Sequence, residues 1–211
     1  MDTLKVITRI EELDKKRSKI YINQEFAFVL YKGEIIQYKL REEKQIEDNV
    51  YDAIQKEILP KRAKKKSLNL LQKRPYTEQK LREKLIEGYY PEEIIEEAIE
   101  YVKSFCYIDD YEYACQYIFY HKESESRRKI EDKLSLRGIA KEVLEQAFRD
   151  SYDEEEQLEI ELQQAKKLLE KKRYDAETAD WKEKKKIYAF LMRKGISFAV
   201  IRKVMNLREE V

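Results

Sequence analysis

Few residues of this chain have the types and spacing that catalysis requires. His121 is the only histidine, and in the run Tyr120-His121-Lys122 it is expected at an exposed helix end, away from any nucleophile. Cys106 and Cys115 stand nine residues apart and lack the close ligand pairs of a zinc site. Neither glycine-rich phosphate motif, G-x-x-x-x-G-K-[ST] or G-x-G-x-x-G, occurs. We therefore predict that the protein is not an enzyme and uses no metal or cofactor.

Basic side chains are the stronger candidates for function. Residues 111–156 carry 8 basic and 12 acidic groups and residues 157–211 carry 14 and 9, although the net charge of the chain is only +1. Basic groups are therefore in excess in the last segment. A basic surface there can face an anionic partner such as nucleic acid or a nucleoprotein, but solvated helix faces have a similar composition. The expected contact residues follow two helices: Arg127, Arg128, Lys129, Lys133 and Arg137 in the first cluster, and Lys184, Lys185, Lys186, Arg193, Lys194 and Arg202 in the second.

Tyrosine is unusually frequent, with 16 residues in 211. One interpretation is packing between structural units by large side chains that have a polar tip. The alternative is stacking of exposed rings on nucleic-acid bases. Both remain open for the tyrosines that crowd one part of the chain, namely Tyr89, Tyr90, Tyr101, Tyr107, Tyr111, Tyr113, Tyr117 and Tyr120.

The candidate residues are carried by a segment that occurs three times. Its apolar positions recur without gaps, 49 residues from the first copy to the second and 57 from the second to the third, as in Leu85, Leu134 and Leu191. A period of this size indicates a tandem array in which each unit buries its apolar face against a neighbour. We predict three units of three helices each, at 61–108, 109–156 and 157–211, with the eight extra residues of the third unit inside 171–186.

Glycine marks the corner between the second and third helices of two units. Gly138 and Gly195 occupy equivalent positions, where glycine can take the left-handed conformation that ends a helix. The first unit has Tyr89 there and Gly88 one residue earlier, so this turn is expected to shift by one residue. Thr77 is the expected cap of the second helix of the first unit.

The first 60 residues have a different pattern. Runs of β-branched and aromatic residues at 19–22, 25–30 and 34–38 are separated by possible turns at Asn23-Gln24 and Lys32-Gly33. They predict a small antiparallel hairpin or meander, which should pack on the helices because two or three strands are marginal alone. Residues 44–58 predict an amphipathic helix. The expected fold is mainly α, an elongated array of three three-helix repeats preceded by this 1–60 segment of strands and a helix.

Composition also indicates where in the cell the protein is expected. No apolar run approaches the roughly 20 residues that span a bilayer, and the N-terminus lacks the apolar core of a signal peptide. Two cysteines make a poor disulfide framework. We expect a cytoplasmic protein that does not enter a membrane.

Several motifs together resemble the RecX family of bacterial regulators of the RecA recombinase. The run L70-L-Q-K-R-P-Y-T-E-x-x-L81-x-x-K-L85 is similar to the family's leucine helix, Arg-Pro stop and Leu-x-x-x-Leu helix. Y107-I-D-D-x-x-Y-A114 resembles its aspartate pair followed by an aromatic-alanine step. R127-R-K-I-x-x-K-L-x-x-R-G138-I and F190-L-M-R-K-G195-I-S resemble its helix-to-glycine elements. The resemblance covers about residues 60–205, and it departs from the family at Tyr89 and in the long segment before Ile187.

The resemblance implies binding along the groove of a RecA filament on single-stranded DNA. It also implies modulation, usually inhibition, of ATP hydrolysis, strand exchange and co-protease activity in DNA repair. We expect the protein to be a monomer. Two other interpretations stay open: a helical protein that binds DNA directly, and a protein–protein scaffold without RecA. Direct reading of DNA would require a basic recognition helix, whereas the third helices at 92–100 and 142–149 are acidic or mixed.

Overall fold

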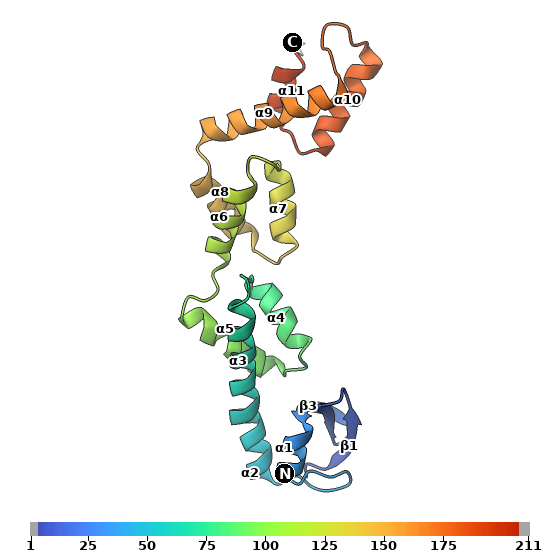
Figure 1. Ribbon diagram of the computed structural model, residues 1–211, viewed down its shortest axis with the longest axis vertical. Helices are drawn as coiled ribbons and strands as arrows, with labels where there is room; N and C mark the ends of the chain where they lie inside the picture. The colour runs from blue at the N-terminus through green and yellow to red at the C-terminus, as the bar shows by residue number, and fades with distance from the viewer. Residues whose placement is uncertain (1–3, 207–211) are drawn as a thin grey trace. The chain divides into compact units, whose positions relative to one another are not determined.

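The structure is a computed structural model that describes residues 4–206. The chain forms two compact units, one ending at Ile108 and the other beginning at Asp109. Figure 1 shows a small sheet in the first unit and only helices in the described part of the second. The prediction of a mainly helical protein with a small N-terminal sheet is confirmed. No helix within residues 4–206 has the length and apolar character needed to cross a membrane.

The sheet is an antiparallel meander of β1 (Ile7–Glu12), β2 (Arg17–Ile22) and β3 (Glu25–Tyr31). Asn23 and Gln24 join β2 to β3 with φ values of 51° and 74°, so this predicted turn is confirmed. The two faces of the sheet differ because successive side chains of a strand point to opposite sides. Along β2 the even-numbered residues are buried and the odd-numbered residues are partly exposed.

Two elements of this region differ from the prediction. The segment 34–38 is not a strand, because Lys32–Gln37 forms the helix α1, and Lys32-Gly33 begins that helix instead of a turn between strands. The Glu34 carboxylate accepts a hydrogen bond from the Tyr31 backbone N–H at 2.7 Å, which satisfies a donor at the helix start. Strand β1 was missed because its charged residues, including Arg9 and Glu11, weaken the β-branched pattern.

The predicted amphipathic helix at 44–58 is present over Asp48–Ile58, but it does not end before the first repeat. Helix α2 (Asp48–Ala53), a π-helical turn at Ile54–Ile58 and helix α3 (Leu59–Leu71) form one uninterrupted helical run. Pro60 explains the π turn, since proline has no N–H and its ring clashes with a regular α-helical turn. The wider turn lets the Leu59 N–H donate to the Ile54 carbonyl, five residues earlier.

Helices α4 (Glu78–Ile86) and α5 (Glu92–Ser104) complete the first repeat. The predicted cap is confirmed, because the Thr77 hydroxyl accepts from the Lys80 N–H at 3.2 Å. Sheet and repeat share one hydrophobic core, in which α3 packs on α5. Its fully buried side chains come from both parts, among them Ile20, Phe28, Leu30, Leu81, Leu85, Ile95 and Ile99.

The second unit contains two further sets of three helices. The first set is α6 (Asp110–His121), α7 (Arg127–Ser135) and α8 (Lys141–Ser151). The second set is α9 (Glu154–Lys172), α10 (Trp181–Arg193) and α11 (Phe198–Val204). Each set has its own apolar core, and in each the first helix packs on the third. The last set is longer than the set before it in its first helix, with 19 residues in α9 against 12 in α6, and in α10, with 13 residues against 9 in α7. The extra length is therefore not confined to the predicted segment 171–186.

The corner between second and third helices has the same geometry in all three repeats. Tyr89, Gly138 and Gly195 have φ values of 62°, 85° and 82°. The next residue donates its N–H to a carbonyl five residues earlier in every copy, at 3.4, 3.3 and 3.1 Å. The predicted one-residue shift at Tyr89 is therefore wrong. The helix-ending hydrogen bonds fix the register, and Tyr89 adopts a left-handed conformation that is unfavourable for a residue with a Cβ atom.

Candidate partner-binding surface

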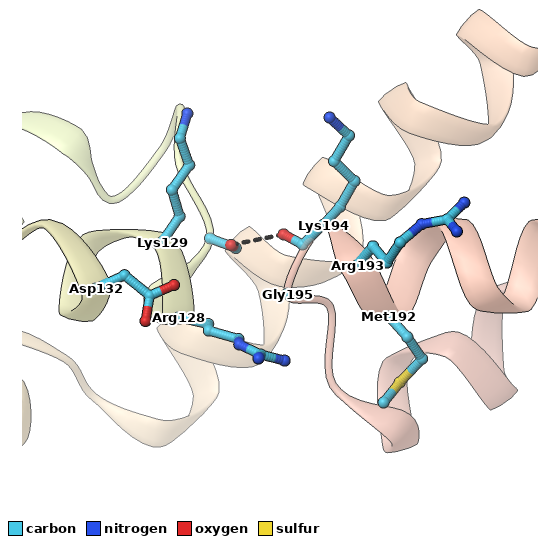
Figure 2. A pocket seen from close by; sticks show the side chains of 8 residues that line it. Arg128, Lys129, Asp132, Met192, Arg193, Lys194 and Gly195 are labelled. Carbon is cyan, nitrogen blue, oxygen red and sulfur yellow. Dashed lines mark hydrogen bonds between the residues drawn. The ribbon is translucent and has the colours of Figure 1, made fainter.

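The start of α7 lies against the end of α10. Ser126 is the residue before α7, but its hydroxyl does not cap that helix. It donates instead to the Lys194 carbonyl at 2.7 Å, a contact between two repeats that Figure 2 shows as a dashed line. Gln164 of α9 adds two hydrogen bonds from its side-chain amide, to the carbonyls of Lys122 at 2.8 Å and Glu125 at 3.0 Å. The loop before α7 is thus held by both α9 and the α10 corner.

Close packing at this contact requires a glycine. Gly195 is left-handed, and a Cβ atom added to it would lie 2.6 Å from the Ser126 hydroxyl oxygen and 3.0 Å from the Cβ of Arg128. A Cβ atom essentially never approaches another heavy atom within 3.0 Å, so no larger residue fits without movement. The glycine of the third repeat therefore ends a helix and also admits the second repeat.

An open hollow of about 500 Å³ lies at this contact. It brings together four of the eleven basic residues predicted from the sequence, with one carboxylate, Asp132, in its lining. Figure 2 shows the side chains of Lys129 and Lys194 on one side of the Ser126–Lys194 hydrogen bond, and that of Arg128 on the other. The four basic residues are Arg128, Lys129, Arg193 and Lys194.

A second hollow, of about 560 Å³, lies along α10. Arg193 lines both hollows, and Lys186 is the other predicted residue found here. Sequence reasoning missed Lys172 and Lys182 in this lining, although both belong to the lysine-rich stretch before Ile187. Asp180 and Glu183 are its acidic members. We call the basic residues of the two hollows the basic surface: Arg128, Lys129, Lys172, Lys182, Lys186, Arg193 and Lys194.

The charges at the start of α7 are unfavourable for that helix. Its first turn carries Arg127, Arg128 and Lys129 and no acidic residue. Because the N-terminal end of a helix has a partial positive charge, each cation there costs about 0.3–1 kcal/mol. In contrast, α5 begins with Glu92 and Glu93. The cations at the start of α7 therefore do not stabilise this helix through its dipole.

Internal partners neutralise only part of this charge. Glu125 accepts from Lys133 at 2.6 Å and lies 3.3 Å from the Lys129 ammonium. The hydrogen bond from Lys133, together with Lys129, lowers the pKa of Glu125, and Glu125 raises the pKa of Lys133. Arg128, Arg193 and Lys194 form no ion pair with another residue of 4–206. No ion pair within the described part of the chain neutralises these three side chains.

The other predicted residues lie elsewhere. The Arg127 guanidinium lies 4.7 Å from the Phe148 ring centroid and donates to Gln157 at 3.2 Å. Arg137 lies 4.4 Å from the ring centroid of Tyr117, and Arg202 lies 5.6 Å from that of Phe198. Lys184 is half-buried and Lys185 exposed, and neither lines the two hollows. The structure thus gives Arg127, Lys133, Arg137 and Arg202 internal contacts. Lys194 of the first hollow also lies near a ring, 5.7 Å from the centroid of Phe190.

Comparisons with known proteins agree with this architecture. Models of the first and third three-helix domains of RecX match residues 63–101 and 159–205. A regulatory protein RecX of Caldanaerobacter subterraneus subsp. tengcongensis is 29% identical over 204 residues, which are 96% of this chain and 99% of that protein. The regulatory protein RecX of Clostridium botulinum strain Eklund 17B is 28% identical over 95% of this chain and 94% of its own length.

Solved structures give the same fold. A crystal structure of a regulatory protein RecX superposes with a TM-score of 0.64 at 24% identity, covering 97% of this chain and all of that one. RecX from Lactobacillus salivarius gives a TM-score of 0.60 at 24% identity, covering 71% of this chain and 98% of the other. The molecule is therefore a helical-repeat protein built from three-helix units and an N-terminal sheet. The chain belongs to the RecX family.

Proposed function

We propose that this protein binds the RecA filament on single-stranded DNA and inhibits its ATP hydrolysis, strand exchange and co-protease activity. The observation that carries the proposal is the similarity to proteins named regulatory protein RecX over nearly the whole of both chains. We propose that it acts in the cytoplasm and as a monomer, with single-stranded DNA reached through the filament.

The basic surface is the proposed contact with that nucleoprotein. Two consecutive repeats contribute to it, and Arg128, Arg193 and Lys194 have no internal carboxylate partner among residues 4–206. A nucleoprotein offers phosphates and acidic side chains that such cations attract, and their release of counterions makes the binding sensitive to salt. The remaining predicted residues are proposed to add to the positive electrostatic potential without direct contact. They are Arg127, Lys133, Arg137, Lys184, Lys185 and Arg202.

We also propose that different parts of the chain have different roles. The segment 1–60 would support the repeat 61–108, because the two share a core. The repeats 109–156 and 157–211 would carry the basic surface. The separate apolar cores of the last two repeats support this division.

The proposal is tested by titrating the protein into RecA assembled on single-stranded DNA and following ATP hydrolysis. We expect hydrolysis to slow as the protein is added. Unchanged hydrolysis at a large excess of protein would contradict the proposal. Binding to duplex DNA in the absence of RecA, without an effect on hydrolysis, would favour a DNA-binding protein. Absence of both effects would favour a scaffold.

A charge-reversal variant tests the surface itself. We expect Arg128→Glu, Lys129→Glu, Arg193→Glu and Lys194→Glu together to weaken filament binding by roughly tenfold or more at low salt, with a smaller difference at high salt. Arg127 is left unchanged because its contacts with Phe148 and Gln157 are internal. Equal affinity of variant and wild type would remove this surface from the contact.

The matched control reverses four exposed lysines of the first unit, Lys15, Lys16, Lys65 and Lys73. It has the same net charge as the variant, so a similar loss in both proteins would mean that only net charge matters. We expect the control to bind the filament within about threefold of wild type, because these lysines lie outside the basic surface.

A further inference from the structure

The outer face of the N-terminal sheet has no role in the function proposed above. Its residues follow from the register: Arg9 of β1 pairs with Tyr21 of β2, and Tyr21 pairs with Phe26 of β3. Ile20 and Ile22, the neighbours of Tyr21 along β2, point into the core and are buried. Tyr21 and its cross-strand partners therefore lie on the side of the sheet opposite the core.

Three aromatic rings follow one another on this face. The ring centroids of Tyr21 and Phe26 are 5.9 Å apart, and those of Phe26 and Tyr89 are 6.2 Å apart. The rings meet at 73° and 64°, so none is stacked face to face on its neighbour. Phe26 is 43% exposed and Tyr89 is 38% exposed. Phenylalanine is usually buried, so neighbouring rings that stay partly exposed make this face a candidate for binding.

Tyr89 reaches this face from the corner between α4 and α5. It occupies the left-handed conformation for which the other two repeats have glycine. A left-handed residue with a Cβ atom costs about 1–2 kcal/mol, and the other two repeats avoid this cost with glycine. In this conformation the Tyr89 ring extends the row formed by Tyr21 and Phe26.

Cations accompany the rings. The Arg9 guanidinium lies 4.0 Å from the centroid of Tyr21, and the Lys19 ammonium lies 4.8 Å from that of Tyr89. Glu11 is the acidic neighbour, 3.1 Å from Arg9 and 3.9 Å from Lys19. Two cations against one carboxylate leave the face positive. Planar rings, a planar guanidinium and excess positive charge complement a ligand that has both flat aromatic groups and negative charge.

We propose that this sheet face binds single-stranded nucleic acid, with unpaired bases stacked on Phe26 and Tyr89 and the phosphates near Arg9 and Lys19. Only an unpaired base offers its flat face to a side chain, so a duplex would not bind in this way. Stacking tolerates any base, and binding would have little sequence preference. The site needs no RecA, so it goes beyond the proposed function and can be tested separately.

The test measures fluorescence anisotropy of a labelled oligothymidine with the full-length protein and without RecA. The variant Tyr89→Gly removes the ring and places at this corner the residue that the other two repeats use, so its fold should be retained. Phe26→Ala removes the central ring. We expect each variant to weaken binding of the oligonucleotide by roughly 5- to 100-fold, the range for loss of one stacked base. Phe119→Ala, which removes a 67% exposed ring of α6, is the matched control and should bind as wild type does.

Other results would overturn the proposal. No binding of the oligonucleotide by wild type, or equal binding by wild type and both variants, would exclude the site. A loss of the same size for a duplex would show that the rings do not act by stacking on unpaired bases. If both variants bind the oligonucleotide normally but no longer slow ATP hydrolysis by RecA filaments, the face contacts protein instead. Circular dichroism of each variant distinguishes loss of binding from loss of fold.

Discussion

The first and third repeats have the same three helices and the same corner, but they differ in what surrounds them. At the corner of the first repeat, Tyr89 accepts a strained conformation and extends its ring over the outer face of the sheet. At the corner of the third, Gly195 leaves no room for a side chain, because Ser126 and Arg128 of the second repeat press against it. One turn thus carries an exposed ring in one copy and a packed backbone contact in the other.

Charge shows a second difference between these repeats. In the first repeat, Arg82 of α4 forms ion pairs with Glu78, Glu92 and Glu96. Its hydrogen bond to Glu96, together with Glu78, raises the pKa of Arg82. In the third, Lys186 and Arg193 of α10 have no ion-pair partner among residues 4–206. Equivalent helices of two repeats therefore differ in charge pairing: basic residues of α4 form internal ion pairs, and these basic residues of α10 form none within the described part of the chain.

The largest effect on stability is expected from Gly195→Ala. The alanine would have to keep the left-handed backbone conformation, and its Cβ atom would collide with the Ser126 hydroxyl. We therefore expect the free energy of unfolding to fall by about 2–3 kcal/mol. Urea denaturation followed by circular dichroism measures the change. Gly33→Ala is the control, because nothing lies within 4 Å of an added Cβ there. An equally small effect at both positions would mean that the second and third repeats are not packed at this corner.

The next largest effect is expected from Arg82→Ala. It removes the shared partner of Glu78, Glu92 and Glu96, whose carboxylates would then repel one another. We expect a loss of about 1–2 kcal/mol, since the pairs are partly exposed. Arg193→Ala, which breaks no ion pair among residues 4–206, should change stability by less than about 0.5 kcal/mol. Similar losses in the two variants would contradict the contrast in charge between the repeats.

Much of the repeat architecture could be predicted because it depends on local patterns. The recurrence of Leu85, Leu134 and Leu191 reports burial directly, and all three are fully buried. Thr77 caps a helix as expected because a cap needs only the next three residues. In contrast, the π turn before Pro60 continues a helix where proline predicts a break, and α1 begins at Lys32-Gly33, where the sequence predicts a turn. Both were misread as breaks between elements.

The candidate site could be predicted only in part, for a similar reason. Clusters such as Arg127-Arg128-Lys129 are visible in the sequence, but it does not show which members have internal partners. The structure assigns Arg127 to Phe148 and Lys133 to Glu125, and leaves Arg128 exposed. The meeting of Ser126 with Lys194 joins residues 68 positions apart, and no local pattern reports such a contact.

A smaller effect separates the two substitutions that remove the Tyr89 ring. Tyr89→Ala keeps the left-handed strain and Tyr89→Gly relieves it, so we expect the glycine variant to be more stable by about 1 kcal/mol. The same pair of residues at position 195 should differ by more, because the collision with Ser126 adds to the strain. Thermal unfolding of the four proteins gives both differences. Equal differences at 89 and 195 would show that strain alone, without the contact between repeats, controls the corner.

The smallest expected effect is a dependence on pH that belongs to the first repeat. The hydrogen bond from Arg82 lowers the pKa of Glu96 below its ordinary value of 4.5, with Lys103 nearby acting in the same direction. A carboxylate with a lowered pKa in the folded state stabilises the fold above its unfolded pKa, and this contribution disappears as the pH falls through the folded pKa. The wild type should therefore exceed Glu96→Gln in stability near neutral pH, and the difference should vanish between about pH 5 and pH 3. A difference that persists at the lower pH would mean that Glu96 acts through packing or neutral hydrogen bonds. The paired charges of the first repeat would then not be the reason for its cohesion.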